Sequence, residues 1–340
     1  MPAPAGPTGV AGPNRRSGVS MINGRNLGDA GTPLWGVAIG SVAETAVAVV
    51  GCKDGSLRTW NLAGGEPGGK PLGAPGSRHR SDVYGVAVGD LDGRPVAASA
   101  GLDGGVGVWD LGAGERRGEF LGGNGGAMNA VALATFGART HLAAGGDDQR
   151  VQVWDLSPAR PIVKGAFGHG ARVLAVTFGI LKKRPIVVSG GDDGLIRVWD
   201  LATGDPYRTL DGRGGAVSAL WVGVLRARPI VVSGGDDGLI RVWDLGDRTT
   251  IPRVLGGADP APNGPVNALA VGAVGGVPTV VSGSETGYVR VWSLDTGALR
   301  GESSHVQNVK GVALGVVDNR VTAISVGWQE DVWRWTLGRP

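Results

Sequence analysis

The chain of 340 residues contains a single cysteine, Cys52. One cysteine cannot form an intramolecular disulfide, and it rules out a metal cage built from cysteines. Because Cys52 ends the apolar run AVAVVGC, we expect a packed side chain rather than a reactive thiol.

Long apolar runs and long basic runs are also missing. No window approaches about 18 uninterrupted apolar residues, so no membrane span is predicted. The first 18 residues lack the apolar core of a signal peptide, and we expect a cytoplasmic protein. The net charge is only +3 and no Lys/Arg-rich run is present, so we expect no nucleic-acid partner. Arginine (27) far outnumbers lysine (6), which suggests a GC-rich bacterial genome.

Glycine is abundant instead, with 64 residues that recur in register with apolar runs. Residues 184–201 read RPIVVSGGDDGLIRVWDL, and residues 228–245 repeat these eighteen letters without change. Such an identity reflects recent duplication, homogenisation or deliberate construction. Looser copies fill most of the chain, so the sequence predicts a repeat protein.

A tryptophan ends each repeat and gives the period. The spacings between successive markers are 49, 45, 45, 44, 49 and 43 residues. The markers are Trp60, Trp109, Trp154, Trp199, Trp243, Trp292 and Trp335. Each unit contains three β-rich runs separated by Gly, Asp or Pro, and a weaker fourth run follows each tryptophan. Seven small four-stranded sheets packed in a ring would cover both faces of these strands.

The chain resembles the WD-repeat (WD40-type) β-propeller family. The resemblance is carried by Ser-Gly-x-Asp-Asp turns, by Gly168-His169, and by the pairs Trp109-Asp110, Trp154-Asp155, Trp199-Asp200 and Trp243-Asp244. It implies an all-β fold: a closed seven-bladed propeller with four antiparallel strands in each blade. We expect residues 1–17 to form a disordered Pro/Gly/Ala-rich tail and residues 18–340 to form the propeller domain.

Closure of the ring follows from counting strands. The last unit ends at its third strand, residues 335–337, while residues 20–27 (SMINGRNL) precede the first unit at the spacing of an outer strand. Because the family usually joins its termini, we predict that these residues complete the seventh blade. Arg334 stands where Val198 stands in the fourth unit, so either the last strand bulges or Arg334 finds a partner.

Serine, histidine, aspartate and tryptophan recur together in two units. These sets are His79, Ser99, Asp103 and Trp109, and His169, Ser189, Asp193 and Trp199. A Ser/His/Asp set suggests a hydrolase. The resemblance implies instead a hydrogen-bond network that ties an outer loop to the inner strands and satisfies the buried indole N–H. Because an active site is seldom copied into several blades, we predict a structural role and no catalytic residue.

In this family the partner usually meets the rim formed by the start of each inner strand and the turn between the second and third strands. Blades 7, 1 and 2 place there an aromatic arc, defined as Trp35, Lys53, Tyr84, Leu102, Lys310 and Trp328. Blades 3 to 6 place there an acidic arc, defined as Asp147, Asp192, Asp236 and Glu285. Aromatic anchors with flanking charge are typical of interface hot spots, and the acids would repel phosphates. The alternative is that the aromatics pack locally and the acids are ordinary turn residues.

The sequence therefore predicts a non-catalytic scaffold, a monomer that binds a protein or peptide through its rim, without metal or cofactor. Two alternatives stay open: a ligand- or glycan-binding propeller, and an enzyme with a site at the central channel. A sugar binder would repeat the same aromatic and polar groups in every blade, whereas this rim differs between blades.

Overall fold

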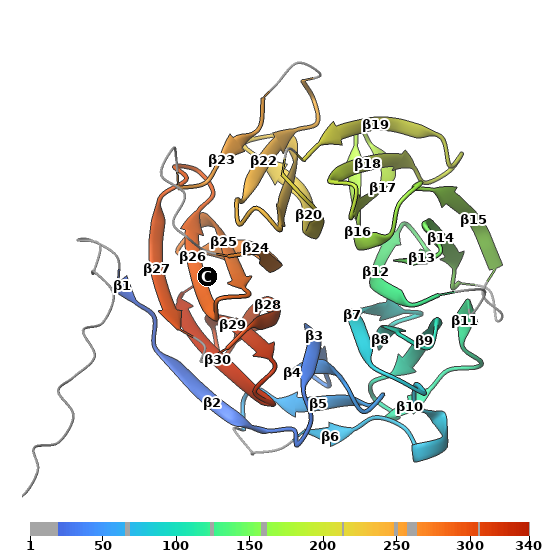
Figure 1. Cartoon of the computed structure of the whole chain (residues 1–340). Helices are drawn as coiled ribbons and strands as arrows, with labels where there is room; N and C mark the ends of the chain where they lie inside the picture. Colours follow the sequence, from blue (N-terminus) through green and yellow to red (C-terminus); the bar gives the residue numbers. More distant parts are fainter. Residues whose placement is uncertain are drawn as a thin grey trace, which may run out of the picture.

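The computed structural model describes residues 20–64, 69–122, 126–157, 162–212, 214–247, 251–256, 264–304 and 307–339. Seven small antiparallel sheets stand as blades around a central channel, with the first strand of each blade innermost (Figure 1). The predicted all-β, seven-bladed propeller is confirmed. The tail predicted for residues 1–17 lies outside the described residues.

Blades 1 to 3 follow one another along the chain. Blade 1 consists of β3 (Leu34–Val42), β4 (Thr45–Cys52), β5 (Leu57–Asn61) and β6 (Lys70–Pro71). Blade 2 consists of β7 (Val83–Leu91), β8 (Arg94–Gly101), β9 (Gly105–Asp110), β10 (Glu115–Arg116) and β11 (Leu121–Gly122). Blade 3 consists of β12 (Met128–Phe136), β13 (Arg139–Gly146), β14 (Arg150–Asp155) and β15 (Ile162–Gly168). In blade 2 the outer strand is split, because β10 and β11 both pair with β9.

Blades 4 to 6 repeat the same order of strands. Blade 4 consists of β16 (Val173–Leu181), β17 (Arg184–Gly191), β18 (Leu195–Asp200) and β19 (Pro206–Asp211). Blade 5 consists of β20 (Val217–Leu225), β21 (Arg228–Gly235), β22 (Arg241–Asp244) and β23 (Arg253–Val254). Blade 6 consists of β24 (Val266–Val274), β25 (Val277–Ser284), β26 (Tyr288–Ser293) and β27 (Leu299–Ser304). The described residues contain one short helix, the 3-10 turn η1 (Pro75–Ser77).

Blade 7 joins the two ends of the propeller. It consists of β28 (Val309–Val317), β29 (Arg320–Gly327), β30 (Asp331–Gly338) and β2 (Gly24–Asp29). β2 runs antiparallel to β30, as predicted for the closing strand. β1 (Ser20–Met21) differs from the prediction, because it runs parallel to β27 as a fifth strand of blade 6. The chain thus passes from the outer edge of blade 6 to that of blade 7 (Figure 1).

The second strand of each blade is enclosed on both faces, which explains its continuous run of apolar and small residues. In β4, β8 and β17 six consecutive residues are buried. The hairpin that follows contains a left-handed residue. In blade 4 it is Gly194, which has φ +74°, and a Cβ there would lie 2.9 Å from the Gly215 carbonyl oxygen. The repeated Asp-Asp-Gly turn therefore fixes the register of the second and third strands.

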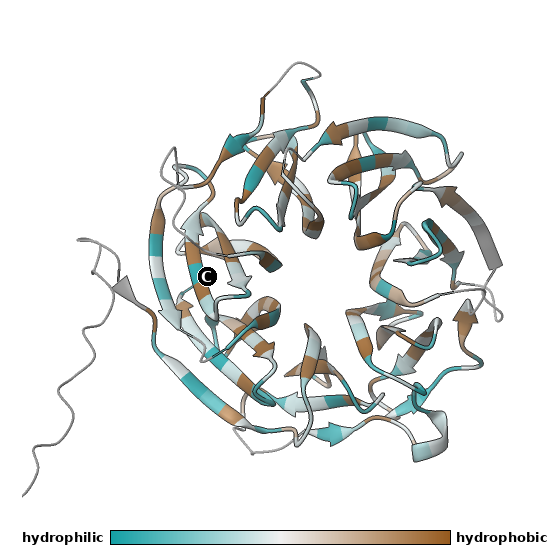
Figure 2. Cartoon of the chain, in the orientation of Figure 1, coloured by the Kyte–Doolittle hydropathy of each residue, from teal (hydrophilic) through white to brown (hydrophobic). Residues whose placement is uncertain are grey.

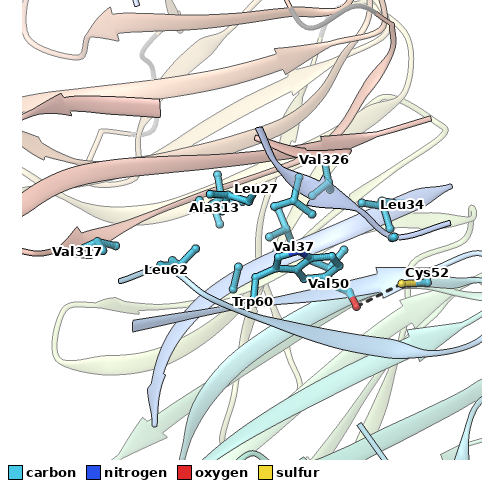
Figure 3. Close-up of a cluster of buried hydrophobic side chains, with 14 residues drawn as sticks. Leu27, Leu34, Val37, Val50, Cys52, Trp60, Leu62, Ala313, Val317 and Val326 are labelled. Atoms are coloured by element: carbon cyan, nitrogen blue, oxygen red, sulfur yellow. Dashed lines mark hydrogen bonds between the residues drawn. The ribbon is translucent and has the colours of Figure 1, made fainter. Parts of the chain in front are cut away.

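The hydrophobic core lies between blades. Brown, apolar segments mark the inner strands around the channel in Figure 2. Figure 3 shows the cluster between blades 7 and 1, where Leu27 of β2, Trp60 of β5 and Ala313 of β28 lie together. The closing strand thus contributes Leu27 to this interior. Cys52 belongs to the same cluster, and burial raises the pKa of its thiol to about 12.

Arg334 has a partner, and the irregularity of β30 lies further along the strand, at Leu337. Arg334 pairs in register with Ile324, and its Nη1 donates to the Leu62 carbonyl at 2.5 Å, which links blade 7 to blade 1. Its Nη2 lies 3.6 Å from the Asp318 carboxylate. No helix among the described residues is long and apolar enough to cross a bilayer.

Candidate functional site

The start of each inner strand and the turn after the second strand lie on one face of the ring. In blade 1, Leu34 pairs with Cys52, and the Lys53 N–H donates to the Pro33 carbonyl at 2.9 Å. In blade 2, the Leu102 N–H donates to the Asp82 carbonyl at 2.8 Å. The two sets of predicted rim positions are therefore neighbours in space.

Every inner strand carries a β-bulge at its start. The register passes from Val83 to Gly85 and from Val309 to Gly311, so Tyr84 and Lys310 are left without a partner residue across the sheet. The bulged residues are Trp35 with Gly36, Tyr84, Asn129, Leu174, Ser218, Asn267 and Lys310. A bulge redirects a side chain out of the regular alternation of a strand. The bulged positions thus form a ring on this face, and the residue type there varies between blades.

Small residues follow each bulge and let adjacent blades approach closely at the channel. The residue that follows the first bulged residue is always glycine or alanine: Gly36, Gly85, Ala130, Ala175, Ala219, Ala268 and Gly311. A Cβ on Gly36 would lie 2.6 Å from the Tyr84 carbonyl oxygen, and one on Gly311 would lie 2.9 Å from that of Trp35. The cavity within this ring has a volume of about 170 Å³.

The three rings of the aromatic arc form one contiguous cluster centred on Trp35. The Trp35 ring meets the Tyr84 ring edge to face at 5.1 Å between centroids, and the Trp328 ring at 5.7 Å. Its indole Nε1 donates to the Asp82 carboxylate at 3.0 Å, which fixes the ring orientation. Blades 7, 1 and 2 therefore share one aromatic surface.

Two lysines lie over this surface. The Lys53 ammonium lies 5.7 Å from the centroid of the Trp328 ring, and the Lys310 ammonium lies 5.6 Å from that of Trp35. Both distances fall within the range of cation–π attraction. Burial lowers the pKa of Lys310, and the nearby Glu285 carboxylate opposes that shift.

Part of the aromatic arc stays open to solvent. Trp328 is 45% exposed and Leu102 is 43% exposed, which is high for large apolar side chains. Local packing of the rings, the alternative considered above, does account for Trp35 and Tyr84, which are half-buried. It does not account for Trp328 or Leu102.

The acidic arc divides into two kinds of residue. Asp147 accepts a hydrogen bond from Asn129 at 3.0 Å, and Asp192 accepts one from Arg172 at 2.7 Å. Within the ranges described above, no ion pair is formed by Asp236 or Glu285. Two of the four acids, Asp147 and Asp192, are therefore bound by neighbouring side chains, which fits the alternative that they are ordinary turn residues.

Two of the bulged residues bind the next blade instead of facing a partner. Asn129 donates to the Val173 carbonyl at 3.1 Å, and Asn267 donates to the Val309 carbonyl at 3.0 Å. These amides connect blade 3 to blade 4 and blade 6 to blade 7. The sequence indicated their position but gave no signal for this role.

The predicted hydrogen-bond network is complete in blade 2. His79 Nδ1 lies 2.9 Å from Asp103 Oδ1, and its Nε2 lies 2.7 Å from Ser99 Oγ. The Trp109 indole donates to the same Ser99 oxygen at 2.8 Å. Ser99 and His79 are buried, so the set resembles a catalytic triad in composition but connects two strands, the turn between them and an outer loop in the interior.

Blade 4 differs from the prediction. The Trp199 indole donates to Ser189 Oγ at 3.0 Å. Arg197 Nη1 donates to the Asp193 carboxylate at 2.8 Å and lies 2.9 Å from His169 Nδ1. Burial, and then the positive charge of Arg197, lower the pKa of His169 to about 4. The arginine thus stands where a direct histidine–aspartate contact was expected.

A side chain at the position of Arg197 binds the turn aspartate in other blades as well. The turn aspartate is bound by a side chain four residues later, in the pairs Asp54–Arg58, Asp148–Gln152, Asp193–Arg197 and Asp237–Arg241. Blade 2 has Gly107 at this position, which leaves Asp103 free for His79. The i, i+4 spacing was the signal in the sequence that the histidine-centred interpretation missed.

The indole–serine bond is the more regular part of the network. It forms in five blades, at Trp109–Ser99, Trp199–Ser189, Trp243–Ser233, Trp292–Ser282 and Trp335–Ser325. Blade 1 has Val50 in place of the serine, and the buried Trp60 Nε1 has no hydrogen-bond partner. The described residues also contain no group of three His, Cys, Asp or Glu side chains arranged to hold a metal ion.

Comparison with known proteins identifies two segments of the chain as members of a repeat family. Residues 162–200 and 204–244, which cover the outer strand of blade 3, all of blade 4 and the first three strands of blade 5, match the WD40 family (WD domain, G-beta repeat). No curated protein matches the chain. These two matches show that the chain contains WD40 repeats, and the structure sets them within a seven-bladed β-propeller.

Proposed function

We propose that this propeller is a non-catalytic scaffold, a cytoplasmic monomer that binds a protein or peptide partner through the aromatic arc. WD40 propellers typically serve as interaction scaffolds, and the two WD40 matches support this class of function. The observation that carries the proposal is the contiguous cluster of Trp35, Tyr84 and Trp328, with Trp328 45% exposed and two lysines over the rings.

The physical argument rests on what the arc offers a partner. Partly exposed aromatic rings held rigidly by their neighbours provide large contact areas at little entropic cost, and such residues dominate interface energetics. The bulges hold Trp35 and Tyr84 on this face, and Asp82 fixes the Trp35 ring. The arc is thus preorganised, which favours binding.

The asymmetry of the rim favours one partner segment over repeated small ligands. Aromatic and basic side chains occur on blades 7, 1 and 2, whereas acids occur on blades 3 to 6. A glycan that binds each blade equivalently would need the same groups in every blade. A single polypeptide segment across the aromatic arc needs no such repetition.

A crosslinking pull-down from native lysate tests the proposal. The wild type is compared with Trp35→Glu/Trp328→Glu and with Ile180→Glu/Val224→Glu, two exposed apolar residues at the opposite end of the inner strands. All three proteins must show the same melting curve. A protein captured by the wild type and by the control, but lost by the aromatic variant, supports the proposal. Capture that survives the aromatic variant contradicts it and gives priority to substrate and glycan screens.

A further inference from the structure

The two lysines determine which charge the aromatic arc can accept. A cluster of aromatic rings can hold a cationic ligand over its ring faces. Here the Lys53 and Lys310 ammonium groups already lie over the Trp328 and Trp35 rings, at 5.7 and 5.6 Å from the centroids. A second cation in the same place would be repelled, since like charges at such distances destabilise each other. The arc is therefore unsuited to a lysine-like ligand.

Both ammonium groups could gain from a carboxylate. In the parts of the chain that the structure describes, neither Lys53 nor Lys310 forms an ion pair within 4.0 Å. Lys310 is half-buried, and its charged form is partly desolvated, with Glu285 nearby but not in contact. A charge that has lost water and has no direct partner is where an incoming carboxylate forms a strong, charge-assisted hydrogen bond.

An exposed apolar side chain is adjacent to these charges. Trp328 keeps 45% of its surface exposed, and it is the ring under Lys53. A partner side chain that covers it must be aromatic or large and aliphatic. The acidic arc occupies blades 3 to 6 and repels a carboxylate, so an acidic segment is directed toward the lysines of blades 7 and 1.

We propose that the segment bound by the aromatic arc carries an Asp or Glu next to an aromatic or large aliphatic residue. Its carboxylate contacts Lys53 and Lys310, and its apolar side chain covers Trp328. This inference rests on the proposed function, because it names the chemistry of the partner at the same site.

Three synthetic libraries of random nonapeptides test the inference by fluorescence polarisation. They carry a fixed central Glu-Phe, Lys-Phe or Glu-Ala pair, and each is titrated with wild-type protein. We expect the Glu-Phe library to bind about tenfold more tightly than the other two, the difference that one charge-assisted contact or one buried ring provides. The preference should weaken with added salt.

Lysine variants provide the matched control. Lys53→Gln/Lys310→Gln should reduce the Glu-Phe over Lys-Phe preference to about twofold or less, while Lys70→Gln/Lys182→Gln, away from the arc, should leave it unchanged. Melting curves confirm that each variant is folded. Equal binding of the three libraries, or no binding of any, overturns the inference, as does a preference that survives in the Lys53/Lys310 variant.

The pull-down separates this inference from the proposed function. If the partner is lost with Trp35→Glu/Trp328→Glu but retained with Lys53→Gln/Lys310→Gln, the arc binds a partner without the acidic contact. The proposed function then stands and the inference is wrong. Loss of the partner with both variants supports both.

Discussion

Arg197 binds the carboxylate of Asp193, four residues earlier, at 2.8 Å. In blade 2 the equivalent carboxylate, that of Asp103, binds His79 at 2.9 Å instead. The turn aspartate is thus engaged in both blades, but by different side chains. The residue two places before the tryptophan, Arg197 or Gly107, accounts for the difference.

The two histidines should differ in their contribution to stability. His79→Ala removes hydrogen bonds to both Asp103 and Ser99, and we expect the free energy of unfolding to fall by about 2–4 kcal/mol. His169→Ala leaves Asp193 bound to Arg197, so its cost should be lower by about 1 kcal/mol or more. Urea denaturation of both variants checks the order. A larger loss for His169→Ala would contradict this account of the networks.

His169 should make the stability of the protein depend on pH. Its pKa is lowered from 6.5 to about 4 in the folded state. Between these values the unfolded chain binds a proton that the folded chain does not, so the free energy of unfolding falls as the pH decreases from 6.5 toward 4. Above pH 6.5 the contribution is fully present. Denaturation of wild type and His169→Gln at several pH values measures it, and an identical slope for both proteins between pH 6.5 and 4 would refute the assignment.

Two tryptophans of equal burial should respond differently to the same substitution. Trp109→Phe removes a buried hydrogen bond to Ser99, whereas Trp60→Phe removes an N–H that has no partner beside Val50. We expect Trp60→Phe to cost about 1–2 kcal/mol less than Trp109→Phe. Thermal or chemical denaturation of the pair provides the comparison, and equal losses would show that the indole–serine bond contributes little.

Closure by β2 predicts a sharp boundary in truncations. A chain that begins at residue 18 keeps β2 and should melt like the full-length protein. A chain that begins at residue 29 loses the pairing with β30 and the buried Leu27, and should melt lower by about 5 °C or more. Calorimetry on both proteins gives the answer. Equal melting temperatures would mean that β2 does not hold the ring closed.

The fold was predictable because its signals are local and repeated. The tryptophan period, the Asp-Asp-Gly turns and the continuous apolar runs each specify strands within one blade, and seven copies specify the ring. The transfer of β1 to blade 6 was not predictable in this way, because the letters SMINGRNL do not show where a strand changes from one sheet to another.

The site was predicted in position but only partly in detail. The sequence placed Trp35, Tyr84 and Trp328 on one rim, since Trp35 and Tyr84 start inner strands and Trp328 lies in the turn that shares this rim. It could not show that Asn129 and Asn267 bind neighbouring blades, because those contacts are to backbone carbonyls that carry no sequence signal. The Arg197–Asp193 pair was visible as an i, i+4 spacing but was outweighed by the histidine motif.

The most direct test of the central claim, binding through the aromatic arc, is hydrogen–deuterium exchange of the propeller alone and with its captured partner. The account predicts slower exchange in the segments around Trp35, Lys53, Leu102 and Trp328, and unchanged exchange around Ile180 and Val224 on the opposite face. Protection confined to the opposite face, with the aromatic arc unaffected, would contradict the claim.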